Sequence, residues 1–163
     1  MKRLLSIILG VFLLVMPFTG CKDKEKDDAT LYKLTGSDGV YSLKIDDDSL
    51  EDDEQTVFSY ELKQFAKMDL LPGLVSSSFK IITDRARIQN TLDYLFADIQ
   101  LQESEEAITK AEPRSLYYTF YGEQGQVLLH IIVWMDGGVY VSAGDDRYYS
   151  KENACDYQAL SSM

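Results

Sequence analysis

Residues 126–135 read Gln-Val-Leu-Leu-His-Ile-Ile-Val-Trp-Met, and this run decides the fold that the sequence predicts. From position 127 to position 135 every residue is apolar except His130. Successive side chains of a strand point to opposite faces of a sheet, so such a run places apolar groups on both faces. We therefore expect a central strand whose two faces are both covered.

The segments beside this run predict a β-meander. Gly-Glu-Gln-Gly at 122–125 precedes it and Asp-Gly-Gly at 136–138 follows it, and both are typical turn sequences. Strand-like runs lie on the far sides of these turns, at 115–121, 139–143 and 147–150. Strands joined by such short connections pair antiparallel, so the four runs predict one sheet.

The main helix is predicted upstream of the meander, over residues 84–98. Thr83 or Asp84 can cap its first turn. The apolar residues that follow recur at helical spacing and form one stripe: Ile88, Leu92, Leu95, Phe96 and Ile99. A second, short helix is expected after Asn153 and ends near Leu160.

Strands are also predicted in the first half of the chain. Residues 31–34 and 40–45 are β-type runs, and Gly-Ser-Asp-Gly at 36–39 favours a hairpin between them. Residues 78–82 are typical of a strand as well.

The segment 56–68 is ambiguous. Phe58, Leu62 and Phe65 follow helical spacing, whereas Phe58, Tyr60 and Leu62 alternate as they would in a strand. The second half of the segment is rich in helix-forming residues, which favours a helix.

Together these segments predict one α+β domain over residues 31–163. We expect a mostly antiparallel sheet of four to six strands that includes the C-terminal meander. The main helix is expected to pack on one face of this sheet, and the short helix to follow at the C-terminal end.

The first residues of the chain predict an export signal. Lys2 and Arg3 form a basic head, and an apolar run at 4–16 follows that is too short for a stable membrane span. Phe-Thr-Gly-Cys at 18–21 resembles the lipobox of bacterial lipoproteins, with Phe18 where that family usually carries Leu.

This resemblance implies that 1–20 is a signal peptide, cut before Cys21, and that Cys21 carries lipid. The charged segment 21–30 is then a tether. Such a protein is held outside the cytoplasm by its lipid, on the plasma membrane of a Gram-positive cell or on the outer membrane of a Gram-negative one. The alternatives are an ordinary cleaved signal with a chance cysteine and an uncleaved anchor. The resemblance implies nothing about activity.

Charge excludes some partners. The 163 residues carry 16 Lys and Arg against 27 Asp and Glu, a formal net charge of −11. Without the signal the chain has 14 basic and 27 acidic residues, a formal charge of −13. Nucleic acid binding requires clustered Lys and Arg, so it is not expected. Anionic lipid would repel such a chain, and membrane attachment therefore depends on the lipid at Cys21.

Residues 46–54 carry seven carboxylates in nine positions. Hard cations such as Ca²⁺ bind several carboxylate oxygens, which makes a weak candidate site of Asp46, Asp48, Asp52 and Glu54. The segment lacks the central glycine of an EF-hand loop. We favour a solvated loop and expect no metal or other cofactor.

Catalytic groups are sparse. His130 is the only histidine, and we expect it to be a hydrogen-bonded core residue. Cys155 lies beside Asp156, which disfavours a reactive thiolate, so a small buried apolar role is expected. No nucleotide-binding or nucleophile-elbow motif occurs, and we predict that the chain is not an enzyme; an enzyme that uses His130 is the less favoured alternative.

Tyrosines offer the better indication of function. The chain has 11, and six lie in or beside the meander: Tyr117, Tyr118, Tyr121, Tyr140, Tyr148 and Tyr149. Tyr117 and Tyr121 share one face of their strand. With Tyr140 and Trp134 they form a candidate binding face for an envelope protein or a glycan. The alternative is that strands simply favour aromatic residues. The sequence thus predicts a lipid-anchored, extracytoplasmic, non-catalytic binding module.

Overall fold

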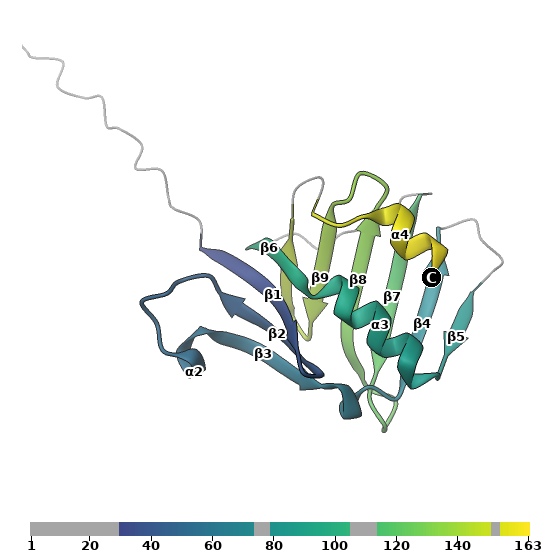
Figure 1. Ribbon diagram of the computed structural model, residues 1–163, viewed down its shortest axis with the longest axis horizontal. Coiled ribbons are helices and arrows are strands. Elements are labelled where there is room, and N and C mark those ends of the chain that lie inside the picture. The colour runs from purple at the N-terminus through teal and green to yellow at the C-terminus, as the bar shows by residue number, and fades with distance from the viewer. Residues whose placement is uncertain (1–29, 74–78, 105–113, 151–153) are drawn as a thin grey trace, which may run out of the picture.

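The computed structural model describes residues 30–73, 79–104, 114–150 and 154–163. They form a curved antiparallel sheet of ten strands, in the order β3-β2-β1-β6-β10-β9-β8-β7-β4-β5 (Figure 1). The strands are β1 (Leu31–Ser37), β2 (Val40–Ile45), β3 (Thr56–Glu61), β4 (Lys67–Pro72), β5 (Lys80–Ile82), β6 (Ala97–Glu103), β7 (Ser115–Tyr121), β8 (Val127–Trp134), β9 (Val139–Ala143) and β10 (Asp146–Tyr149).

Helices are few, as expected. They are α2 (Asp52–Gln55), α3 (Arg85–Leu95), α4 (Tyr157–Ser162) and the 3₁₀ turn η1 (Leu62–Gln64). Asp84 caps α3, where its side chain accepts a hydrogen bond from the backbone nitrogen of Arg87. The cap of α4 is Asp156 rather than Asn153, which lies outside the described residues.

The sheet is larger than the predicted four to six strands, partly because residues 56–68 and 97–103 form strands that we did not predict. The segment 56–68, which we expected to be helical, forms β3, η1 and the start of β4. Phe58 and Tyr60 alternate toward the core there, and pairing with β2 outweighs the modest helix propensity of the following residues.

The main helix is also shorter than the predicted 84–98. It ends at Leu95, with Phe96 as its C-cap, and the chain enters β6 directly. Ile99 therefore belongs to a strand and not to the helical stripe. Pairing with β1 explains this, because Ala97 and Ile99 pair with Thr35 and Leu34 of that strand, which satisfy the backbone groups that a longer helix would have bonded.

The predicted hairpin at the start of the domain is confirmed. β1 pairs with β2 from Tyr32 with Ile45 to Ser37 with Val40. Asp38 and Gly39 between them have φ angles of 51° and 75°, the left-handed conformations that a tight hairpin turn requires.

The core lies on the side of the sheet that α3 and α4 cover (Figure 1). Ile88, Leu92 and Leu95 of α3 and Leu160 of α4 are buried against the inward side chains of the strands. These helices leave the opposite face of the sheet uncovered, and we call it the outer face.

The strand β8 lies between β7 and β9, an interior position as expected, but only one of its faces is fully buried. Leu129, Ile131 and Val133 have no solvent exposure, whereas Ile132 is half-buried and His130 is exposed. The expectation that both faces are covered is therefore wrong. The two helices are too few to form a layer on each side of so wide a sheet.

Candidate binding surface

The outer face carries all four residues of the predicted binding face. Leu116, Tyr118 and Phe120 of β7 point into the core, so Tyr117 and Tyr121 point outward. The same alternation places Trp134 of β8 and Tyr140 of β9 outward.

Cross-strand pairing aligns part of this set in a single row. Leu71 pairs with Tyr117, Tyr117 with Ile132, Ile132 with Tyr140, and Tyr140 with Tyr149. Directly paired residues have Cβ atoms about 4.5–5.5 Å apart, so these side chains are neighbours on the outer face. We call these five residues the apolar row; it crosses β4, β7, β8, β9 and β10. Tyr140 is the most buried aromatic of the row, with 6% exposure, and its neighbours are half-buried.

Trp134 extends this surface toward one end of β8. It pairs with Ser115, two residues beyond the Tyr117–Ile132 pair. Gly138 lies against its ring, and a Cβ atom at Gly138 would come within 2.9 Å of Trp134 Cε3. Close packing against a residue without a side chain thus holds the indole in place.

A second row runs beside the first and is polar. Asp69 pairs with Thr119, Thr119 with His130, His130 with Ser142, and Ser142 with Arg147. We call these five residues the polar row. They lie on the same five strands, two positions from the apolar row.

His130 is therefore not a core residue, contrary to the sequence-based expectation. Its side chain is exposed on the outer face, and Nδ1 lies 3.1 Å from Thr119 Oγ1. Its immediate neighbours in the sequence, Leu129 and Ile131, point to the opposite, buried face of the sheet. This is why the run alone suggests a buried histidine.

Tyr121 belongs to a small charged cluster at the end of β7 and not to the apolar row. Lys67 Nζ lies 3.9 Å from the centroid of its ring and 3.2 Å from Asp69 Oδ1. Lys67 Nζ donates a hydrogen bond of 3.3 Å to Asp69 Oδ2, whereas its contact with Oδ1 lacks hydrogen-bond geometry. Burial raises the pKa of Tyr121, and a hydrogen bond with Asp69 adds to this effect.

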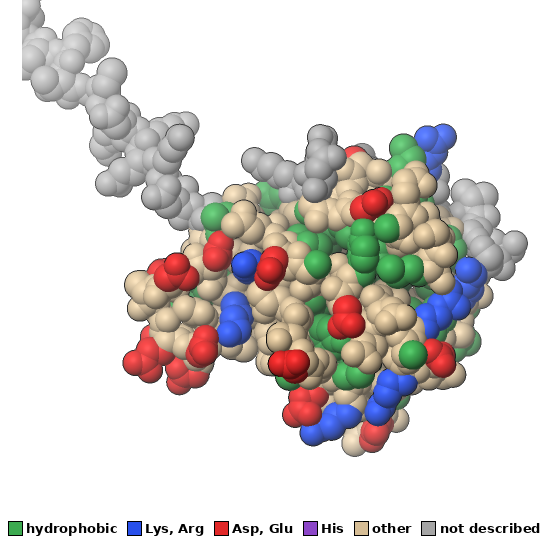
Figure 2. Space-filling model, viewed as in Figure 1, with side chains coloured by type: hydrophobic (Ala, Val, Ile, Leu, Met, Phe, Trp, Pro, Cys, Tyr) green, Lys and Arg blue, Asp and Glu red, His purple; other side chains and the backbone are tan. Residues whose placement is uncertain are grey.

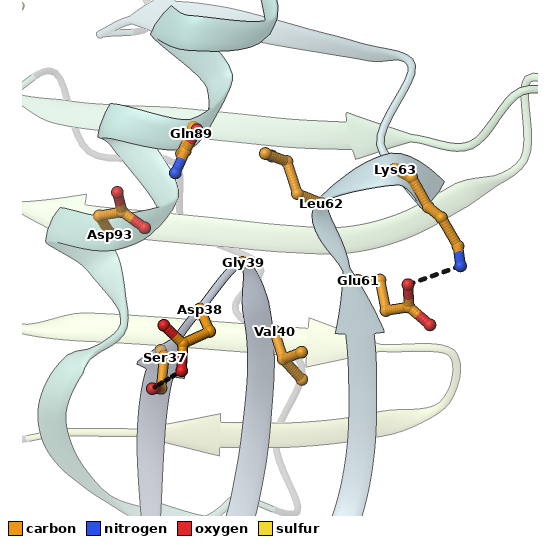
Figure 3. Close-up of a pocket in the computed structure, with 10 residues that line it drawn as sticks. Ser37, Asp38, Gly39, Val40, Glu61, Leu62, Lys63, Gln89 and Asp93 are labelled. Atoms are coloured by element: carbon orange, nitrogen blue, oxygen red, sulfur yellow. Dashed lines mark hydrogen bonds and ion pairs between the residues drawn. The ribbon is translucent and has the colours of Figure 1, made fainter.

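A separate hollow of about 620 Å³ lies where the β1–β2 turn approaches α3 (Figure 3). Its charged groups are largely engaged. Glu61 pairs with Lys63 at 2.6 Å, and Asp93 accepts a hydrogen bond of 2.6 Å from Tyr41. Burial, and next the bond with Asp93, raise the pKa of the Tyr41 phenol. The corner therefore joins the hairpin to the helix.

The acidic segment 46–54 does not gather its carboxylates. Asp46 accepts a hydrogen bond from Gln100, Asp47 from Ser49, and Asp52 pairs with Lys44 at 3.2 Å. Acidic side chains of this segment spread over the surface around α2 (Figure 2). In the described ranges no three potential metal ligands come together, so the candidate set that includes Asp48 and Glu54 gains no support.

Cys155 is half-buried and packs against the core. Burial raises its pKa to about 11, and the neighbouring Asp156 acts in the same direction. At neutral pH the group is therefore a thiol rather than a nucleophilic thiolate.

The polar row was missed by the sequence reasoning, although part of it carries a signal. The tight turn after Trp134 is recognisable in the sequence, and counting residues outward from it on both strands places His130 opposite Ser142, as the structure does. Asp69 gives no such signal, because β4 joins β7 through a pairing that is distant in sequence.

Cys21 and residues 1–29 of the predicted signal and tether lie outside the described residues. Within the ranges that the structure does describe, no helix has the length and apolarity to cross a membrane. No protein-family model matches this sequence, no curated protein matches it, and no solved structure matches its fold.

Proposed function

We propose that the chain is a lipid-anchored, extracytoplasmic binding module that presents the outer face of its sheet to a partner in the cell envelope. One observation carries the binding part of the proposal: the apolar row crosses five neighbouring strands on a face that α3 and α4 leave uncovered. Tyrosine and aliphatic side chains that lie side by side on a sheet face form the kind of surface that macromolecular partners bind.

The proposal is for a non-catalytic protein. His130 is the one imidazole of the sequence, and its Nδ1 is engaged by Thr119 on an open sheet face. Cys155 has a raised pKa, which opposes thiolate chemistry. Binding requires only the side chains that the outer face presents.

Attachment to the membrane is tested by labelling. Cells that express the full chain are grown with an alkyne fatty acid, and they should yield a labelled protein that lacks its first 20 residues. Cys21→Ser should abolish both the label and the cleavage. An unlabelled protein that keeps its N-terminal segment would refute the anchor.

Binding is tested with the full chain in mild detergent and a solubilised envelope fraction. Tyr149→Ala should weaken retention of the protein on immobilised envelope components, because it removes an aromatic ring from the apolar row. Tyr94→Ala is a matched control, since Tyr94 is a half-buried tyrosine on the helix side. Equal retention of both variants and of the unchanged protein would contradict binding through the outer face.

A further inference from the structure

We propose that the outer face of β8, β9 and β10 binds a glycan chain that bears carboxylate groups. This inference rests on the proposed function and names the class of partner. The first observation is one of charge. The outward side chains of these strands include no Asp or Glu, although the whole chain has a net charge of −11. They are Leu128, His130, Ile132, Trp134, Tyr140, Ser142, Arg147 and Tyr149.

The helix side of the molecule differs in this respect. Carboxylates are spread over that side and around α2 (Figure 2). A partner with negative charge therefore meets no carboxylate among the outward side chains of these three strands, and meets the positive charge of Arg147.

Three hydrogen-bond donors adjoin on this part of the polar row. Ser142 pairs with His130 on one side and with Arg147 on the other, so both neighbours lie one strand spacing away. No carboxylate of the described residues forms an ion pair with Arg147. Its planar guanidinium can thus donate two parallel hydrogen bonds to a carboxylate of a ligand.

His130 adds to this site without losing its existing contact. Its Nδ1 is held by Thr119, and in the described part of the chain no residue hydrogen-bonds Nε2. The exposed Nε2 edge can donate to, or accept from, a sugar hydroxyl, and Ser142 can do the same.

The apolar row supplies the second half of a sugar site. Tyr149 and Tyr140 lie two residues from Arg147 and Ser142 along their strands, a distance of about 6.6 Å. A sugar ring has an apolar C–H face that stacks on an aromatic ring, and polar groups at its edges. A carboxylate-bearing ring that stacks on Tyr149 therefore directs its polar edge toward Arg147.

The shape of the surface favours a glycan over an acidic protein. A stable protein interface buries roughly 1,200–2,000 Å² and has a broad apolar core. Here the apolar row is one side chain wide except at β8, where Trp134 adjoins Ile132, and it has the polar row along its side, both crossing the strands in parallel. An extended chain of sugar rings presents the same two properties, ring face and polar edge, in the same ribbon-like form.

The test titrates the full chain, in mild detergent, with three uronate polymers: polygalacturonate, alginate and hyaluronate. Neutral dextran and poly-glutamate are the comparison probes. We expect binding to at least one uronate, no binding to dextran, and at least tenfold weaker binding to poly-glutamate. Arg147→Gln should weaken the uronate complex at least tenfold, and Tyr149→Leu should weaken it measurably because the ring is lost but the apolar volume is kept.

Lys33→Gln is the matched control, because it removes one positive charge from β1, a strand of the same sheet, where Lys33 already pairs with Asp98 at 3.4 Å. It should leave uronate binding unchanged, and urea unfolding should show that all variants are folded. Poly-glutamate binding as tight as that of the best uronate would overturn the glycan and indicate an acidic protein partner. Failure to bind any uronate, with envelope retention still sensitive to Tyr149→Ala, would overturn the glycan but leave the binding function standing.

Discussion

The sharpest test of this architecture compares two adjacent isoleucines of β8. Ile131 has no solvent exposure and points toward the helices, whereas Ile132 is half-buried on the outer face. Truncation to alanine removes three carbons, worth about 2.4 kcal/mol of transfer free energy at about 0.8 kcal/mol each. At Ile131 an enclosed cavity adds to this, for a loss of roughly 3–4 kcal/mol in the free energy of unfolding.

At Ile132 only part of that transfer free energy is realised and no enclosed cavity forms, so we expect a loss of about 1 kcal/mol. The loss of strand propensity is common to both variants and cancels in the difference. Urea unfolding of the full chain, followed by the fluorescence of Trp134, measures both free energies. A difference of about 2 kcal/mol or more supports an uncovered outer face. Losses that agree within 0.5 kcal/mol would mean that something covers Ile132 as fully as the helices cover Ile131.

Three further predictions follow from particular contacts. Gly138→Ala should shift the emission of Trp134, the only tryptophan of the sequence, because the new Cβ would lie 2.9 Å from its ring; an unchanged spectrum would refute this packing. Burial first, and nearby carboxylates next, raise the pKa of Tyr148 from 10.0 to about 12. Its contribution to stability should be complete below pH 10 and fall between pH 10 and 12, a fall that Tyr148→Phe should reduce in unfolding measurements across this range. Cys155, with a pKa of about 11, should react with iodoacetamide at pH 8 more slowly in the folded chain than in urea, as mass spectrometry of its peptide can show.

The parts of the fold that local sequence predicts are those whose contacts are local. The β1–β2 hairpin and the meander from β7 to β10 follow from turn residues between short strands. The helix prediction for 56–68 is wrong because pairing with β2 determines the conformation of 56–61 and outweighs a weak helix propensity. The predicted end of α3 is wrong for a related reason, since residues 97–99 form the start of β6 by pairing with β1.

The candidate surface was predictable to the same extent. Tyr117, Tyr121, Tyr140 and Trp134 are recognisable as aromatic residues on strands, and alternation places them on one face. What alternation cannot supply is the offset between neighbouring strands, which separates Tyr121 from the apolar row and brings Arg147 beside Ser142.

The chemistry of the outer face is therefore a property of register rather than of any sequence motif. A slip of one residue in β8 would turn Leu129, Ile131 and Val133 outward and would bury His130 among the helices. The tight turns prevent such a slip. Gly125 and Gly137 have φ angles of 79° and 84°, a conformation that few other residues adopt, so each turn fixes which residue begins the next strand. The burial of three large aliphatic side chains thus determines, on the other side of the same strand, that His130 lies exposed beside Ser142 and on the same face as Arg147.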